Sequence, residues 1–305
     1  MRTERGFALI AALWLVVALS AVALQVSLVA RERRLAAANT LEGTQARAAA
    51  DAGLEHARAR LAGMLGRPVV DPWYRVDWVL AAEVVLGDAR YRVRLRDAAS
   101  ALNVNRATET ELRRLLVALR VDAGQADRLA QVVMDWRDPD DLRRARGAER
   151  EEYLREQRPV LPRNGPFQSV AELGSVLGMT PEMLELVRPY LTLLGTGQVN
   201  LNAAPRPVLL ALPGIGEEAA GVLLRRRSAG RPVRSLAELS LGLSSGARAT
   251  LEAQTSELLA RATFETREVE AVSEGWADGS PVRVRAHGLL VRARDVAFLV
   301  WRRTE

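Results

Sequence analysis

An uncharged, strongly apolar run near the N-terminus, from Phe7 to Ala30, constrains this chain more than any other feature. At about 1.5 Å per residue, a helix over this run would cross a hydrocarbon core of roughly 30 Å. Arg2 and Arg5 precede the run, which favours a cytoplasmic N-terminus, but further arginines follow it. Three interpretations remain open: a secretory signal cleaved after Ala21-Val22-Ala23, an uncleaved signal anchor, or a leader of the prepilin type.

The residues before the run favour the third interpretation. A short charged leader ends in Arg5-Gly6, and an aromatic residue, Phe7, opens the apolar run. This pattern resembles the type IV prepilin signal, which implies cleavage between Gly6 and Phe7 by a prepilin peptidase, followed by methylation of the new N-terminus. Most pilins carry a glutamate five residues into the mature chain, where this sequence has Ala11. A subunit without that carboxylate suits the tip of a filament rather than its body.

The helical pattern continues beyond the apolar run. No proline precedes Pro68, and small or apolar residues recur at steps of three and four. The sequence therefore predicts one helix from about Phe7 to Leu65, roughly 90 Å long, half in a membrane and half under a head. The alternative is a membrane helix followed by a separate soluble helix. The stripe that we expect to contact partner helices comprises Ala46, Ala49, Ala50, Gly53, Leu54, Ala57 and Leu61.

Two β regions lie far apart in the chain. Tyr91, Val93 and Leu95 alternate with arginines, and Gly87-Asp88 offers a turn to an opposing strand at residues 84–86. Three further strands are predicted at 264–272, 282–290 and 296–301, with turns at Asp278-Gly279 and Arg294-Asp295. Neither region could bury its apolar face alone, so we expect one antiparallel sheet. The predicted fold is α+β and pilin-like, with a large all-α domain inserted into the sheet region.

The insert contains a repeat. Asn103-Val104-Asn105 and Asn200-Leu201-Asn202 each open a leucine-patterned helix, and each is followed later by a serine–glutamate capping box. The second copy holds Leu212-Pro213-Gly214-Ile215-Gly216, which resembles a helix-hairpin-helix hairpin. In DNA-binding proteins such glycines present N–H groups to phosphate, and Arg225 to Arg227 would add charge. A membrane-anchored, competence-type DNA-binding protein is therefore the alternative function. The net charge of +6 gives it little support, because the arginines are interspersed with 37 acidic residues.

An acidic loop interrupts the first copy, with four aspartates between positions 135 and 141. Oxygen ligands on a turn, with a glutamate returning from downstream, suit calcium, and no nearby histidine or cysteine points to zinc. The alternative is a solvated loop in which Arg143, Arg144 and Arg146 pair with the aspartates.

In the order of these motifs the chain resembles the type II secretion minor pseudopilin K family (general secretion pathway protein K). The resemblance implies a non-enzymatic filament-tip subunit anchored in the inner membrane, its head in the periplasm, that helps to export folded proteins. Its implied partners are the minor pseudopilins I and J, with H and the major pseudopilin G, and no nucleic acid. The implied calcium ligands come from Asp138, Asp140, Asp141, Glu149, Glu151 and Glu152. The expected organisation is a leader at 1–6, a transmembrane helix at 7–30, the outer spine helix at 31–66, a β part at 67–100, an insert of two helix-hairpin-helix/SAM-like repeats at 101–262, and a second β part at 263–305.

Overall fold

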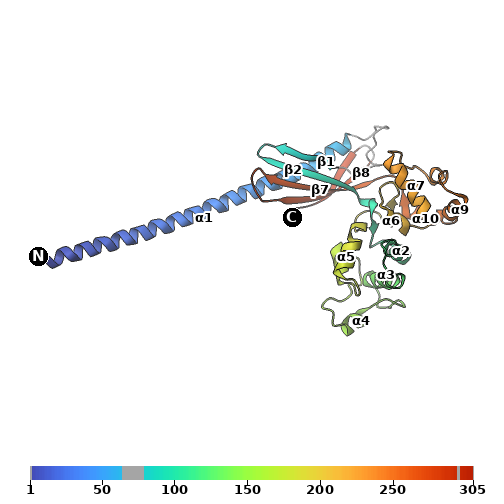
Figure 1. Cartoon of the computed structure of the whole chain (residues 1–305), viewed down its shortest axis with the longest axis horizontal. Coiled ribbons are helices and arrows are strands. Elements are labelled where there is room, and N and C mark those ends of the chain that lie inside the picture. Colours follow the sequence, from blue (N-terminus) through green and yellow to red (C-terminus); the bar gives the residue numbers. More distant parts are fainter. Residues whose placement is uncertain (1, 64–78, 294–295, 305) are drawn as a thin grey trace.

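A computed structural model describes residues 2–63, 79–293 and 296–304. Helix α1 runs without a break over Arg2–Ala62, which confirms a single spine helix and not two separate ones. Its N-terminal half projects from the head as a bare rod, and its C-terminal half lies against the sheet (Figure 1). The predicted end of the spine at 64–66, the start of the β region at 67–78 and the turn Arg294-Asp295 lie outside the described residues.

The head contains one five-stranded antiparallel sheet in the order β1-β2-β7-β8-β9. Its strands are β1 (Val79–Leu86), β2 (Ala89–Asp97), β7 (Glu268–Ala277), β8 (Val284–Ala293) and β9 (Val296–Thr304). Strands β2 and β7 pair along their whole length, from Ala89↔Ala277 to Asp97↔Val269. The two β regions therefore form a single sheet that the helical insert interrupts, as the sequence predicted.

Strand β7 begins at Glu268, four residues after the predicted start at Phe264. The reason is that Ala262–Thr263 still belongs to the insert, where it forms β6 and pairs with β5 (Val199–Asn200). The chain then crosses from the insert back to the sheet before β7 starts.

One face of the sheet packs on α1. The residues Tyr91, Val93 and Leu95 of β2 point to this face and are buried, whereas the arginines between them lie on the other face. There Arg92 pairs with Glu274 of the neighbouring β7 at 2.6 Å. The period of two in β2 therefore separates an apolar face that packs on α1 from a charged outer face.

The insert carries two helical repeats at the end of the head away from the N-terminus (Figure 1). The first comprises η2 (Ala98–Ser100), β3 (Leu102–Asn103), α2 (Glu109–Ala118), α3 (Ala123–Arg137), α4 (Arg150–Arg155), η3 (Val170–Ser175), α5 (Pro181–Val187), η4 (Arg188–Tyr190) and β4 (Leu191–Thr192). The second comprises β5, α6 (Arg206–Ala211), α7 (Glu217–Ser228), α8 (Leu236–Ser240), α9 (Ser245–Ala253), α10 (Thr255–Arg261) and β6. Both repeats contribute to one apolar core.

The asparagine pairs have the same role in both repeats. The Oδ1 atom of Asn103 accepts a hydrogen bond from the Asn105 N–H at 2.9 Å, and Asn200 accepts one from the Asn202 N–H at 3.0 Å. The Asn202 side chain then exchanges two hydrogen bonds with the backbone of Val233, and the Asn105 side chain does the same with the backbone of Phe167. The repeated sequence motif is thus a repeated backbone staple.

Candidate functional site

The N-terminal half of α1 is the first candidate functional element. Within the described residues, one helix, in the range Leu13–Ala62, is long and apolar enough to cross a membrane, by length and composition. Its large apolar side chains are open to the surroundings, with Trp14 68% and Leu24 63% exposed. A bare apolar rod of this size requires a covering phase or partner. Gly6, Phe7 and Ala11, the residues expected at the processing site and at the missing glutamate, lie on the first turns of this helix.

The stripe from Ala46 to Leu61 does not lie where we predicted. All seven of its residues are buried against the protein's own sheet, and its six apolar side chains are each 0% exposed. A Cβ atom added to Gly53 would lie 2.1 Å from the Ser273 hydroxyl oxygen, so the helix and sheet are already in close contact. The prediction of a partner interface along this stripe is therefore wrong. The small residues allow close packing, as expected, but within the head.

The acidic loop lies between α3 and α4 and is held by aromatic packing. Trp136, near the end of α3, stacks on Phe167 with ring centroids 6.0 Å apart and contacts Tyr153 of α4 at 5.7 Å. The Trp136 indole N–H donates to Glu172, and the Tyr153 hydroxyl accepts from the Leu177 N–H. The ends of the loop are therefore fixed by a rigid, buried frame.

Arginine neutralises part of the loop. The fully buried Asp135 accepts hydrogen bonds from the backbone and side chain of Arg144, which also pairs with Asp138. Gly147 lies over this carboxylate, and a Cβ there would be 1.8 Å from Asp135 Oδ2. Arg143 lies 3.7 Å from Glu152. The salt-bridged alternative is thus realised at Asp135, which is not among the implied calcium ligands, and at one oxygen of Asp138, which is.

Glu149 is the exception within the loop. The residue is only 4% exposed, and neither oxygen of its carboxylate has a hydrogen-bond partner in the part of the chain that the structure describes. The second oxygen of Asp138, Oδ1, is buried and unpartnered in the same way. Burial, followed by the negative charges of the nearby aspartates, raises the pKa of Glu149 to about 7. Buried carboxylate oxygens without donors are costly unless a cation or a proton neutralises them.

The other candidate ligands are distributed around this pair. Asp140 accepts from the Leu142 N–H, Asp141 accepts from the Asn164 side chain at 2.8 Å, and Glu152 accepts from the Glu149 N–H at 3.0 Å. Glu151 is exposed. No group of three or more acidic or histidine side chains in the described ranges is arranged at metal-ligand spacing. The donor set is nevertheless all oxygen, and the unpartnered atoms of Glu149 and Asp138 fit a hard cation.

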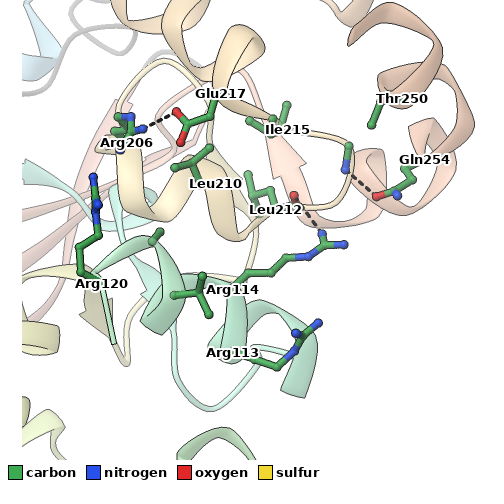
Figure 2. Close-up of a pocket in the computed structure, with 14 residues that line it drawn as sticks. Arg113, Arg114, Arg120, Arg206, Leu210, Leu212, Ile215, Glu217, Thr250 and Gln254 are labelled. Carbon is green, nitrogen blue, oxygen red and sulfur yellow. Dashed lines mark hydrogen bonds and ion pairs between the residues drawn. The ribbon is translucent and has the colours of Figure 1, made fainter. Parts of the chain in front are cut away.

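The glycine hairpin of the second repeat forms one wall of an open cavity with a volume of ≈ 470 Å³ (Figure 2). Gly214 has a φ of +70°, which explains the glycine, but its N–H donates to the Gln254 side chain at 2.6 Å. Of the arginines proposed for DNA, Arg226 pairs with Glu238, and Arg227 donates to the Ala203 and Ala204 carbonyls. The Gly214 N–H and two of the three arginines proposed for DNA are therefore already engaged within the fold.

Comparisons with known proteins agree with this architecture. Residues 92–196, from β2 to the end of the first repeat, match the family model described as Type II secretion system (T2SS), protein K. The type II secretion system protein K of Dickeya chrysanthemi is 30% identical over 90 residues, which are 30% of this chain and 24% of that protein. A candidate type II secretion system protein K of Escherichia coli (strain K12) is 29% identical over 120 residues, 37% of each protein. The chain thus matches only 37% and 24% of the lengths of these two curated relatives.

The fold extends the likeness to most of the chain. A chain in the crystal structure of the GspK-GspI-GspJ complex from the enterotoxigenic Escherichia coli Type 2 Secretion System superposes with a TM-score of 0.72 at 19% identity, over 89% of this chain and 99% of that chain. A long apolar helix, packed on a split antiparallel sheet with a helical insert, defines a pilin-like α+β protein. The matched family model narrows the likeness for part of the chain: residues 92–196 are similar to the type II secretion system protein K family.

Proposed function

We propose that this protein is a minor pseudopilin that initiates or caps a type II secretion pseudopilus from its tip, in the export of folded proteins across the outer membrane. The observation that carries the proposal is the position of the insert, which extends from the end of the head farthest from the N-terminal rod (Figure 1). A subunit stacked above would meet this bulk, whereas subunits below would not. The role is architectural and needs no catalytic residue.

The apolar rod supports single-pass anchoring in the inner membrane, with the head in the periplasm. Cleavage between Gly6 and Phe7 by a prepilin peptidase, and methylation of Phe7, would release the leader and leave the rod as the mature N-terminus. Ala11, in place of a glutamate, removes the carboxylate that would pair with the amine of a neighbouring subunit. Such a chain cannot pair with the N-terminal amine of a neighbouring subunit at this position, which suits a subunit at the tip of the filament.

The relative of known structure was solved in a complex with GspI and GspJ. We infer that the minor pseudopilins I and J are partners of this chain too, with H and the major pseudopilin G below them. Because the stripe from Ala46 to Leu61 is buried in the head, contact with partners falls on the exposed part of α1. Leu35 and Leu41 lie there, beyond the membrane-length run, and are 56% and 60% exposed.

We also propose that the acidic loop binds calcium, with Glu149 and Asp138 as the central ligands and Asp140 and Asp141 beside them. The support is the buried Glu149 carboxylate, whose two oxygens have no hydrogen-bond partner among the described residues, together with the unpartnered Oδ1 of Asp138 and the raised pKa of Glu149. A divalent cation would neutralise the loop and stabilise the first repeat. Calcium should therefore raise the melting temperature of the protein.

N-terminal sequencing of the membrane-extracted protein, after co-expression with a prepilin peptidase, tests the class. The expected product begins at methylated Phe7 and co-purifies with pseudopilins I and J. A product that retains Met1, or that begins at Leu24, would overturn the pseudopilin assignment. Correct processing without co-purification of either partner would refute the tip complex alone.

A further inference from the structure

The cavity beside the glycine hairpin lies at the boundary between the two repeats (Figure 2). Helix α2 of the first repeat packs directly on α6 of the second, and the loop from Leu212 to Gly216 closes one side. Its volume of ≈ 470 Å³ is within the usual range for sites that take a ligand or a short peptide segment. We call this cavity the repeat groove.

The lining of the repeat groove is strongly positive. It includes four arginines, Arg113, Arg114, Arg120 and Arg206, but one acidic residue, Glu217, which pairs with Arg206. Arg114 donates one N–H to the Leu212 carbonyl at 3.3 Å. Within the described residues, the exposed side chains of Arg113 and Arg120 make no ion pair. Their guanidinium groups are therefore available to an anionic partner, and each fits a carboxylate through two parallel hydrogen bonds.

The floor of the repeat groove is apolar. Val117, which is 43% exposed, lines the groove together with Leu210 and the buried Leu212 and Ile215. A partner that filled the groove would therefore bring an aliphatic side chain as well as negative charge. A nucleic acid backbone supplies the charge without the aliphatic group. In addition, the Gly214 N–H that would bind its phosphate already donates to Gln254.

We propose that the repeat groove binds an acidic peptide segment. One of its aliphatic side chains lies over Val117 and Leu210, and its carboxylates bind Arg113 and Arg120. The inference rests on charge complementarity and an apolar floor at the same place, and it goes beyond the filament role. The segment thus belongs to another protein, and the repeat groove recognises its negative charge and one of its aliphatic side chains.

Fluorescence anisotropy with the full chain in non-ionic micelles tests this proposal, with empty micelles as the blank. The probe is a fluorescein-labelled peptide of alternating aspartate and leucine. Two reference probes are a peptide of alternating aspartate and serine and a DNA oligonucleotide of the same net charge. We expect saturable binding of the leucine peptide, and binding at least about tenfold weaker for each reference probe.

The variant that removes the proposed contacts is Arg113→Ser/Arg120→Ser, which should weaken binding of the leucine peptide by about tenfold or more. The matched control is Arg225→Ser/Arg231→Ser, two exposed arginines outside the groove, which should change the Kd less than about twofold. Circular dichroism checks that both variants fold. No saturable binding, equal weakening in both variants, or tighter binding of the DNA would each overturn the proposal.

Discussion

Replacing Glu149 with glutamine should make the calcium-free protein more stable at pH 8 and insensitive to calcium. The side chain keeps its size but loses a charge that is buried without a donor. In the folded protein the pKa of Glu149 is raised from 4.5 to about 7. At about 1.4 kcal/mol per pKa unit, ionised Glu149 costs the folded state on the order of 3 kcal/mol more than the unfolded state.

The sign of the shift fixes the pH window. A raised carboxyl pKa means that the folded protein holds the proton more tightly, so Glu149 carries no penalty below pH 4.5. The penalty grows as the pH rises and is complete above pH 7. Without calcium, Glu149→Gln should therefore match the original protein near pH 4.5 and exceed its unfolding free energy by up to about 3 kcal/mol at pH 8.

Urea unfolding of the full chain in micelles, followed by tryptophan fluorescence with a chelator present, measures this difference, and Trp136 lies next to the loop. Adding calcium at about 100 times its Kd should stabilise the original protein by roughly 2.7 kcal/mol and leave Glu149→Gln unchanged. The exposed Glu156→Gln serves as a control and should keep the calcium response. A Glu149→Gln protein that is less stable at pH 8, or a difference that does not vary with pH, would refute the reasoning.

Three other substitutions test the packing and the interface. Gly275→Val should lower the unfolding free energy by about 2 kcal/mol or more, because a Cβ atom at this position of β7 would lie 2.3 Å from the Ala46 carbonyl oxygen of α1. The control is Gly43→Ala on α1, where an added Cβ atom meets open space, so this variant should not lower the unfolding free energy. Thermal unfolding of both variants measures the difference. Asn202→Ala should cost about 2 kcal/mol in urea unfolding, since it leaves the Val233 backbone unpaired, and a loss below about 0.5 kcal/mol would contradict the staple. Leu41→Asp should weaken co-purification with pseudopilins I and J at an unchanged melting temperature; intact co-purification would move the interface elsewhere.

The elements that the sequence predicted well are those with a strict period or a local cap. The absence of proline and the steps of three and four predicted the single spine helix, and the alternation in β2 predicted the face that packs on it. The capping residues Ser169 and Ser235 do accept the N–H of the glutamate three residues on. These signals are local, so no tertiary contact was needed to interpret them.

The misplaced stripe shows what periodicity leaves out. Alanine and glycine at close spacing predict that something packs tightly on a helix, but not whether it belongs to the same chain. The deciding contact, between Gly275 and the Ala46–Ala50 turn, joins residues more than 200 positions apart by number. The pairing of Arg144 with Asp135 was equally hidden, since several arginines and aspartates lay within reach along the loop.

The joint between sheet and insert decides whether the insert can act as a tip. The chain leaves the sheet after β2 and returns before β7, and the fully buried Asp97 lies at this double crossing. Its carboxylate accepts from the Ala99 N–H, from the Asn200 side chain at 2.7 Å and from the Thr266 hydroxyl. Asp97, the last residue of β2, thus connects the start of the first repeat, the second repeat and the segment that leads back to β7. Because these hydrogen bonds are buried and charge-assisted, the joint resists bending, and a force along α1 would reach the insert through a stiff connection.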